Sequence, residues 1–362
     1  MRVLGQRHEV SLGTIQSAMT VLERDGLIQR RPNRAARVVR RVSKSVRRHW
    51  PKNGALMLLR SGREPLWSDL TRGVLRSARR MGAEPLVVNA DRGVDRSVQV
   101  IGHLPANVRG LLVQPYDRQP YVAALRKAMD AGVRVVQVER LIDAVNTDSV
   151  THDDYFGAYE ATQHLIDLHN RPVHYLGYAD SDLSSLRDRQ RGWAGAMEAA
   201  GFLDWQEYFL DLGTTVKMTH PVQQVGGLVY LQEGCDRALE LFNSGRQQRY
   251  SIFCVGDWSA LGVYRAAEQA KFVVGRDVFA VGFYDYPMCR RLDPPLSSVA
   301  VDMQQLGYEA ANLLYDQLDD PPRPPVHRVL PVTLKAHRSS LGQAQAAAFV
   351  AQAPEEVSQL EG

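Results

Sequence analysis

The sequence predicts an α/β protein with a two-lobed body behind a short basic amino-terminal module. From Gly54 onward, short apolar runs alternate with amphipathic helices, the pattern of a parallel sheet covered on both faces. The alternation runs through two successive series, which predicts two similar lobes. Positive charge is concentrated at the front, because residues 1–50 hold 12 Arg and Lys against three acidic residues, whereas the whole chain of 362 residues has a net charge of +4. A basic front on a mildly acidic body indicates that only the front meets a polyanion.

The amino-terminal stretch 10–31 has the pattern of one helix followed by a stop. Its apolar residues recur every three or four positions, which places on one helix face Val10, Ile15, Ala18, Met19 and Leu22. Ser11 is the expected N-cap, and Gly26 ends the helix. Residues 27–31 and 36–40 are expected strands joined by a Pro-Asn-Arg turn. A helix, a stop and a basic two-stranded hairpin predict a winged helix.

The motif V-S-x-G-T-I-x-x-A-M-x-x-L-E-x-D-G-L-I-x-R-R over these residues resembles the second half of a GntR-type (gluconate-repressor-like) DNA-binding domain. The resemblance covers roughly the first 40 residues and implies a recognition helix in the major groove. It places at the DNA Arg2, Ser11, Leu12, Thr14, Gln16, Arg31 and Arg34. Leu12 departs from the usual polar residue, the wing turn lacks the usual glycines, and the family's first helix does not precede this stretch.

The body is read as two series of elements. The first has expected strands at 55–59, 84–89, 110–114, 133–138 and 173–177, and expected helices at 67–81, 96–103, 120–131 and 155–168. The second has expected helices at 186–200, 228–243 and 258–270, and expected strands near Tyr208 and at 251–254 and 278–282. Residues 213–227 are polar and aperiodic, and are expected to form a surface insertion.

These series give the expected domain boundaries. Residues 1–41 form the partial winged helix, 42–53 a basic linker, 54–340 the two-lobed body, and 341–362 a disordered tail. Lobe 1 is expected at about 54–177 and 303–320, and lobe 2 at about 182–299 and 325–340. The crossovers on which the lobes would tilt are therefore expected near 177–182 and 299–303.

Several stretches of the body, in order, are similar to the effector domain of the LacI/GalR (lactose/galactose repressor) family: VRVVQVER, DDYFGAYEATQHLIDL, SLRDRQRGWAGAM, SIFCVGDWSALGVYRAAEQ and DVFAVGFYDYPMCRRLDPPLSSV. The resemblance implies a periplasmic-binding-protein-like (type I) fold with a ligand between the lobes. A GntR-type head on such a body resembles the arabinose-repressor-like subgroup of sugar-responsive regulators.

The resemblance also implies the ligand contacts. Arg189 matches the arginine that grips ligand oxygens, a task suited to the fixed fork of a guanidinium. Glu139, Asp257 and Asp285 each follow or end an expected strand at the cleft. The alternatives are structural roles that involve no ligand. Arg189 could form a surface ion pair with Asp188 or Glu198, and Glu139 and Asp285 could be helix caps or solvated acids.

Two departures shape the expected ligand. Gly256 stands where the family usually has Asn, and Tyr284 stands where it usually has Asp, so an amide and a carboxylate are lost. Tyr284 and Trp67 offer aromatic faces that suit a sugar ring or an aromatic ligand. Both could instead be ordinary core residues. The expected effector is a small polar molecule, most simply a sugar.

Other classes of site find little support. The odd, scattered cysteines Cys235, Cys254 and Cys289 predict reduced core thiols. His164, His169 and His174 are spaced by five, which puts no pair on one helix face and argues against a metal. No P-loop, G-x-G-x-x-G or G-x-S-x-G motif is present, so we expect neither catalysis nor a cofactor. The chain has no apolar run long enough for a bilayer and no apolar signal region, so a cytoplasmic location is expected.

Together these features predict a transcription regulator, most simply a repressor. Its expected partners are a double-stranded DNA operator, a sugar effector and a second copy of the chain, because a twofold operator demands a twofold protein. The alternative is a cytoplasmic sugar sensor that has lost DNA binding, motivated by the missing first helix of the head.

Overall fold

The computed structural model describes residues 28–29, 37–38, 54–60, 65–90, 93–179, 181, 183–213, 227–245, 247–317 and 324–342. The chain divides into two compact units, 1–49 and 50–362. In the first unit, strands β1 (Ile28–Gln29) and β2 (Arg37–Val38) pair antiparallel, with Ile28 opposite Val38, as the expected hairpin requires. The expected helix, the linker, residues 343–362 of the expected tail and all seven DNA-contact residues, from Arg2 to Arg34, lie outside the described residues.

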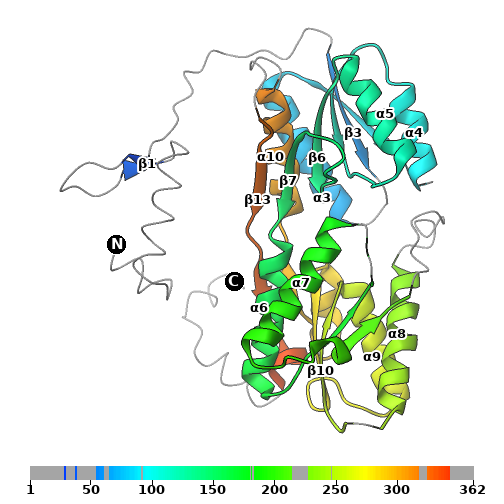
Figure 1. The fold of residues 1–362 in the computed structure, drawn as a ribbon, viewed down its shortest axis with the longest axis vertical. Coiled ribbons are helices and arrows are strands. Elements are labelled where there is room, and N and C mark those ends of the chain that lie inside the picture. Colours follow the sequence, from blue (N-terminus) through cyan, green and yellow to red (C-terminus); the bar gives the residue numbers. More distant parts are fainter. Residues whose placement is uncertain are drawn as a thin grey trace, which may run out of the picture. The chain divides into compact units, whose positions relative to one another are not determined.

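The second unit contains two six-stranded sheets, one in each lobe (Figure 1). In lobe 1 the strand order is β13-β7-β6-β5-β3-β4, and every neighbouring pair is parallel. Its strands are β3 (Ala55–Arg60), β4 (Glu84–Asn89), β5 (Val108–Val113), β6 (Arg134–Glu139), β7 (Asp148–His152) and β13 (His327–Leu330), and its helices are α3 (Pro65–Met81), α4 (Gly93–Gly102), α5 (Gln119–Asp130) and α10 (Met303–Asp316).

Lobe 1 has an apolar core on each face of its sheet. Along β3, Leu56 and Leu58 join the core beneath α3 and α10, whereas Ala55, Met57 and Leu59 join the core beneath α4 and α5. Successive side chains of a strand point to opposite faces, so a strand covered on both sides must be apolar throughout. This is why the sequence of β3 was recognisable.

In lobe 2 the strand order is β14-β12-β11-β10-β8-β9, with only the β12–β14 pair antiparallel. Its strands are β8 (His174–Gly177), β9 (Phe209–Asp211), β10 (Tyr250–Cys254), β11 (Val278–Tyr284), β12 (Ser297–Ala300) and β14 (Thr333–Lys335); its helices are α6 (Asp154–His169), α7 (Ser184–Ala199), α8 (Leu228–Asn243) and α9 (Asp257–Gln269), with short turns η1 (Trp205–Tyr208) and η4 (Pro287–Arg291). Its core is rich in aromatic rings; Trp193 stacks on Tyr175 and donates from Nε1 to the Val173 carbonyl at 2.8 Å.

The chain crosses between the lobes three times. It leaves lobe 1 between β7 and α6, returns between β12 and α10, and crosses again between β13 and β14. The crossover expected near 299–303 agrees with the second of these. The crossover expected near 177–182 is wrong, because α6 and β8 belong to the sheet and core of lobe 2. Strand β13 was likewise expected in lobe 2 and lies in lobe 1.

The first crossover was expected too late in the chain because β7, the strand that precedes it, was not recognised. The sequence of β7, DSVTH, contains no apolar run. Asp148 and Ser149 are buried on this strand. The carboxylate of Asp148 accepts from the backbone N–H of Val326 at 2.7 Å, and Ser149 Oγ lies 2.8 Å from the His327 ring. The partners of these polar groups are far away in the sequence, so the strand left no local signal.

The remaining sequence expectations for the body concern its thiols and its surface. Cys235, Cys254 and Cys289 are free and buried, as expected of core thiols. Among the described helices, none is long and apolar enough to cross a lipid bilayer.

Candidate functional site

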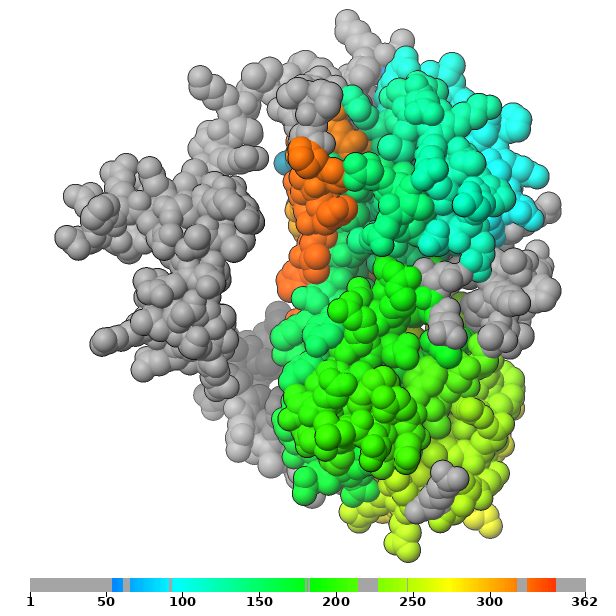
Figure 2. Space-filling model, in the orientation of Figure 1, coloured from blue at the N-terminus to red at the C-terminus, as the bar shows by residue number. Residues whose placement is uncertain are grey.

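Two strand ends meet where the lobes face each other. Glu139 is the last residue of β6 in lobe 1, and Tyr284 is the last residue of β11 in lobe 2. The hydroxyl of Tyr284 donates to Oε1 of Glu139 at 3.2 Å, and Gln114 Nε2 donates to the other carboxylate oxygen at 2.6 Å. Figure 2 shows the body from one side, with the two lobes lying against each other. Because ligands of parallel sheets bind at the carboxyl ends of strands, this pair marks the candidate site.

Arg189, on α7, holds the lobe 2 side of this site together. Its side chain is 2% exposed. Nε donates to Asp154 Oδ1 at 2.7 Å, Nη1 to the Val255 carbonyl at 2.6 Å, and Nη2 to the Tyr284 hydroxyl at 2.9 Å. The guanidinium also lies over the rings of Phe283 and Tyr284, with Cζ 3.8 and 4.5 Å from the two centroids.

These contacts decide between the readings of Arg189. The expected alternative was a surface ion pair with Asp188 or Glu198. Instead, Asp188 pairs with the exposed Arg191, and Glu198 accepts from Trp205 Nε1 at 2.8 Å. The surface ion pair is therefore not the role of Arg189, which is buried and bonded to Asp154 and Tyr284.

Burial controls the protonation of the groups around Arg189. It raises the pKa of the Asp154 carboxyl to about 7, against the opposing effect of the guanidinium 2.7 Å away. Burial also raises the pKa of the Tyr284 hydroxyl, which Arg189 offsets only in part. The hydroxyl therefore keeps its proton near neutral pH and can donate to Glu139 while accepting from Arg189.

The two residues that join the lobes have unusual backbones. Glu139 has φ 69° and Tyr284 has φ 102°, values that residues other than glycine rarely adopt. Such conformations persist only where surrounding contacts over-determine them, and they gather at functional sites. A Cβ at Gly256 would lie 3.7 Å from ring carbons of Tyr284. The two departures from the family pattern, Gly256 and Tyr284, are therefore neighbours in space.

Asp257 lies inside lobe 2 rather than on a ligand surface. It is the first residue of α9, and its side chain is completely buried. Oδ1 accepts from Ser298 Oγ at 2.6 Å, and Oδ2 accepts from the Tyr286 backbone N–H at 2.8 Å. Burial raises the pKa of its carboxyl to about 7. Both oxygens are committed to bracing β11 and β12, which corrects the expectation that Asp257 contacts the effector.

Asp285 and Trp67 are the remaining residues expected to contact the effector. One oxygen of Asp285 pairs with Arg290 at 2.8 Å, while Oδ1 is buried with no hydrogen-bond partner among the described residues. Trp67 is 8% exposed and packs in the lobe 1 core with α3 and α10, which favours its reading as a core residue over that of an aromatic platform.

Sequence reasoning missed polar groups at the carboxyl ends of the lobe 1 strands. Four buried atoms there have no hydrogen-bond partner among the described residues: Arg60 Nε at the end of β3, Asn89 Oδ1 at the end of β4, Tyr116 OH after β5, and His152 Nε2 at the end of β7. Unpaired polar groups are costly when buried, so a cluster of them at one sheet edge points to a ligand. The available signal was a polar residue closing each strand, as in Arg60 and Asn89.

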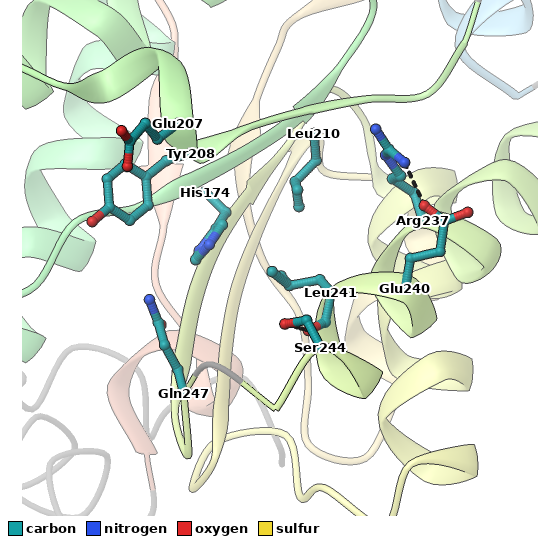
Figure 3. Close-up of a pocket in the computed structure, with 9 residues that line it drawn as sticks. All are labelled: His174, Glu207, Tyr208, Leu210, Arg237, Glu240, Leu241, Ser244 and Gln247. Carbon is teal, nitrogen blue, oxygen red and sulfur yellow. Dashed lines mark hydrogen bonds and ion pairs between the residues drawn. The ribbon is translucent and has the colours of Figure 1, made fainter.

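A cavity, called the second cavity below because it is separate from the candidate site, lies beside β8, β9 and α8 of lobe 2 (Figure 3). This cavity of about 480 Å³ is lined by His174, Glu207, Tyr208, Leu210, Arg237, Glu240, Leu241, Ser244 and Gln247. His174, the first residue of β8, is buried, and burial lowers the pKa of its ring to about 4. The cavity contains none of the expected effector contacts.

The three histidines considered for a metal take separate roles. His164 Nε2 lies 2.8 Å from Ser340 Oγ, and His169 Nε2 lies 2.8 Å from the Ser340 carbonyl, whereas His174 lines the second cavity. Over the described parts of the chain, no three His, Cys, Asp or Glu side chains come together as a metal site would require.

Comparisons with known proteins agree with the geometry of the body. Residues 162–340 match a family described as periplasmic binding protein-like domain, and residues 52–220 match periplasmic binding proteins and sugar binding domain of the LacI family. The ribose operon repressor of Escherichia coli (strain K12) is 26% identical over 197 residues, which cover 54% of this chain and 51% of the repressor. The chain thus spans about half the length of the curated relatives it matches.

Solved structures share the fold. A LacI family transcriptional regulator from Enterococcus faecium with bound ribose has a TM-score of 0.63 at 21% identity, covering 79% of this chain and 98% of that one. The transcriptional regulator CelR in complex with cellobiose has a TM-score of 0.66 at 22% identity, covering 93% of this chain and 94% of its own. These likenesses establish the two-lobed periplasmic-binding-protein-like architecture.

Proposed function

Because residues 52–220 match the sugar binding domain of the LacI family and residues 162–340 match a periplasmic binding protein-like domain, we propose that this chain is a transcription regulator controlled by a small sugar. The sugar binds between the lobes and changes the affinity of the amino-terminal head for operator DNA. The observation that carries the proposal is the convergence of Glu139 from lobe 1 with Tyr284 and Arg189 from lobe 2. The relatives are named as regulators, some of them solved with ribose or cellobiose, which supports a cytoplasmic, non-enzymatic role.

The proposed DNA contacts are those of the head. The GntR-like motif, the net positive charge of residues 1–50 and the β1–β2 hairpin support a winged helix that reads the major groove. Two copies of the chain would present two such heads to the half-sites of a twofold operator. The effector can change DNA affinity only through its different affinities for the two arrangements of the lobes.

A ligand screen tests the effector half of the proposal. Thermal melting of the full chain with ribose, arabinose, glucose and cellobiose should reveal a sugar that raises the Tm. Asn89→Ala should abolish this shift, because it removes an unpaired acceptor at the lobe 1 strand ends. Gln247→Ala, in the second cavity, is the matched control. If only Gln247→Ala lost the sugar-induced increase in Tm, the ligand would be assigned to the second cavity, which would contradict the proposal.

A binding assay tests the DNA half. Duplexes selected from a random library by the full chain should bind in a salt-dependent manner, and the sugar found by melting should change their affinity. Absence of salt-sensitive binding to any selected duplex would favour a sugar sensor without DNA binding.

A further inference from the structure

The hydroxyl of Tyr284 is the central link in a line of polar contacts that runs across the seam between the lobes. It accepts from Arg189 Nη2 at 2.9 Å and donates to Glu139 Oε1 at 3.2 Å. On either side, Gln114 holds Glu139 and Asp154 holds Arg189. A hydroxyl group can accept one hydrogen bond and donate another, and this position uses both abilities.

The ring of the same residue covers the groups that a ligand would need. The guanidinium of Arg189 is 2% exposed, with the Tyr284 ring centroid 4.5 Å from its Cζ. On another side the ring lies near the bare backbone of Gly256, where even a Cβ would be 3.7 Å away. The tyrosine ring is thus one of the groups that cover Arg189, and a ligand that approaches the guanidinium from this side has to move it.

The backbone supports a conformation maintained by these contacts. Tyr284 and Glu139, which touch across the seam, both have positive φ at the last position of a strand. Neither residue gains from that conformation locally, because a side chain makes it unfavourable. The hydrogen bonds that Tyr284 makes with Glu139 and with Arg189 are the contacts that offset this unfavourable backbone conformation.

We propose that the Tyr284 hydroxyl stands in for a hydroxyl of the effector, holding the lobes together when the site is empty, and that the effector displaces it. The inference rests on the proposed function and specifies the regulation of the same site. A second contact across the seam, from the Leu141 backbone N–H to Ser184 Oγ at 3.0 Å, involves neither Arg189 nor Glu139. Removing this contact should therefore loosen the seam between the lobes without freeing Arg189 and Glu139 for a ligand.

The chemistry of the displaced group defines the class of effector. A replacement must accept from the cationic Arg189 and donate to the carboxylate of Glu139. A carboxylate could not donate to Glu139, and an ammonium group could not accept from Arg189. A neutral hydroxyl does both. The displacing group is thus a neutral hydroxyl, which points to a sugar or polyol that binds here through a hydroxyl and not through a charged substituent.

The first experiment measures the distance between the lobes in the full chain. Lys127→Cys on α5 and Glu268→Cys on α9 are exposed positions for a donor and an acceptor dye, and the native cysteines are buried. In this background Tyr284→Phe should lengthen the distance without ligand. Tyr264→Phe is the matched control, because its hydroxyl donates to Pro294 within lobe 2. Equal distances in the two variants would overturn the proposal.

The second experiment measures sugar affinity by calorimetry. Ribose, glucose and cellobiose are the neutral probes, and gluconate and glucosamine are the charged counterparts. Any neutral sugar that binds should bind Tyr284→Phe about tenfold more tightly, a change of about 1.4 kcal/mol, because it no longer competes with the hydroxyl. Ser184→Ala should loosen the seam without this gain. No gain for any sugar that binds the unmodified chain would overturn the displacement, whereas gluconate and glucosamine should gain as much as glucose if they bind through a hydroxyl.

The two experiments separate this inference from the proposed function. A longer distance in Tyr284→Phe supports the proposal that the Tyr284 hydroxyl holds the lobes together, which we call the latch. If none of the sugars binds, that result counts against the proposed effector but not against the latch. An unchanged distance overturns the latch even where a sugar binds the unmodified chain.

Discussion

Replacing Arg189 by Met should reveal how strongly the buried ion pair is coupled to its surroundings. The substitution leaves the Asp154 carboxylate without its cation and the Val255 carbonyl without a donor, at a position where Arg189 is 2% exposed and Asp154 5% exposed. Where Asp154 is ionised, at and above its pKa, removing its partner costs about 3–5 kcal/mol of stability. Arg191→Met is the matched control, because its pair with Asp188 is exposed and should contribute less than about 1 kcal/mol.

The pH dependence of this loss follows from the pKa of Asp154. In the parent chain that pKa is about 7, above the value of about 3.9 for an unfolded chain, so the unfolded state releases its proton first and stability falls as the pH rises from about 4 to 7. Without Arg189 the folded pKa rises further. The deficit of Arg189→Met should therefore stay level between pH 5 and 7 and grow by roughly 1.4 kcal/mol per unit above pH 7.

Urea unfolding of the full chain at pH 5, 6, 7 and 8, followed by tryptophan fluorescence, measures the deficit. Trp193 reports from the core of the same lobe. The double variant Arg189→Met with Asp154→Asn removes the charge and should show a deficit that no longer grows above pH 7. A deficit below about 1 kcal/mol for Arg189→Met, or one that is equal at pH 7 and 8, would refute the assignment of a buried, coupled pair.

Three further predictions concern lobe 2 and the head. Asp257→Asn should remove a fall in stability of at most about 4 kcal/mol between pH 4 and 7, because a buried carboxyl with a pKa of about 7 is ionised only at a cost; urea titration at several pH values measures this. Gly282→Ala should cost at least about 1–3 kcal/mol, since its Cβ would lie 2.2 Å from Asp257 Oδ1, whereas Gly102→Ala, with open space around it, should not destabilise to that extent in the same assay. Gln16→Ala should weaken binding to a selected duplex more than to a random one; equal losses in a gel-shift titration would make Gln16 a phosphate contact.

The sequence predicted the elements whose burial is local. Strands such as β3 and β10 are apolar at nearly every position because helices cover both faces of the sheet. It missed β7 and β13, whose polar residues find partners only in the folded chain. Ser149 and His327 lie 178 positions apart and 2.8 Å from each other. No pattern within a short window contains such a pair.

The candidate site was predicted to a similar extent. The family pattern placed Glu139, Arg189 and Tyr284 at one cleft, and in the structure Tyr284 is hydrogen-bonded to both of the other two; their contact with an effector stays a prediction. Asp257 was misassigned because a carboxylate after a strand looks alike whether it faces a ligand or the backbone of the next strand. Only the donors Ser298 and Tyr286 distinguish the two, and they come from elements far along the chain.

The position of Asp154 connects the site to the crossovers. Arg189 binds Asp154, which opens α6 two residues after the end of β7, so this ion pair lies at the first crossover between the lobes. His152, at the end of β7, bonds through its ring to the backbone of Asp302 at the second crossover, and burial lowers the pKa of that ring to about 4, so it is neutral. A ligand that displaces Tyr284 from Arg189 changes the hydrogen-bond partners of Arg189, whose other partner, Asp154, lies two residues from His152. The contacts that a ligand makes at the strand ends are therefore made next to the crossover segments. A ligand that binds one arrangement of the lobes better than the other can act on their relative position there.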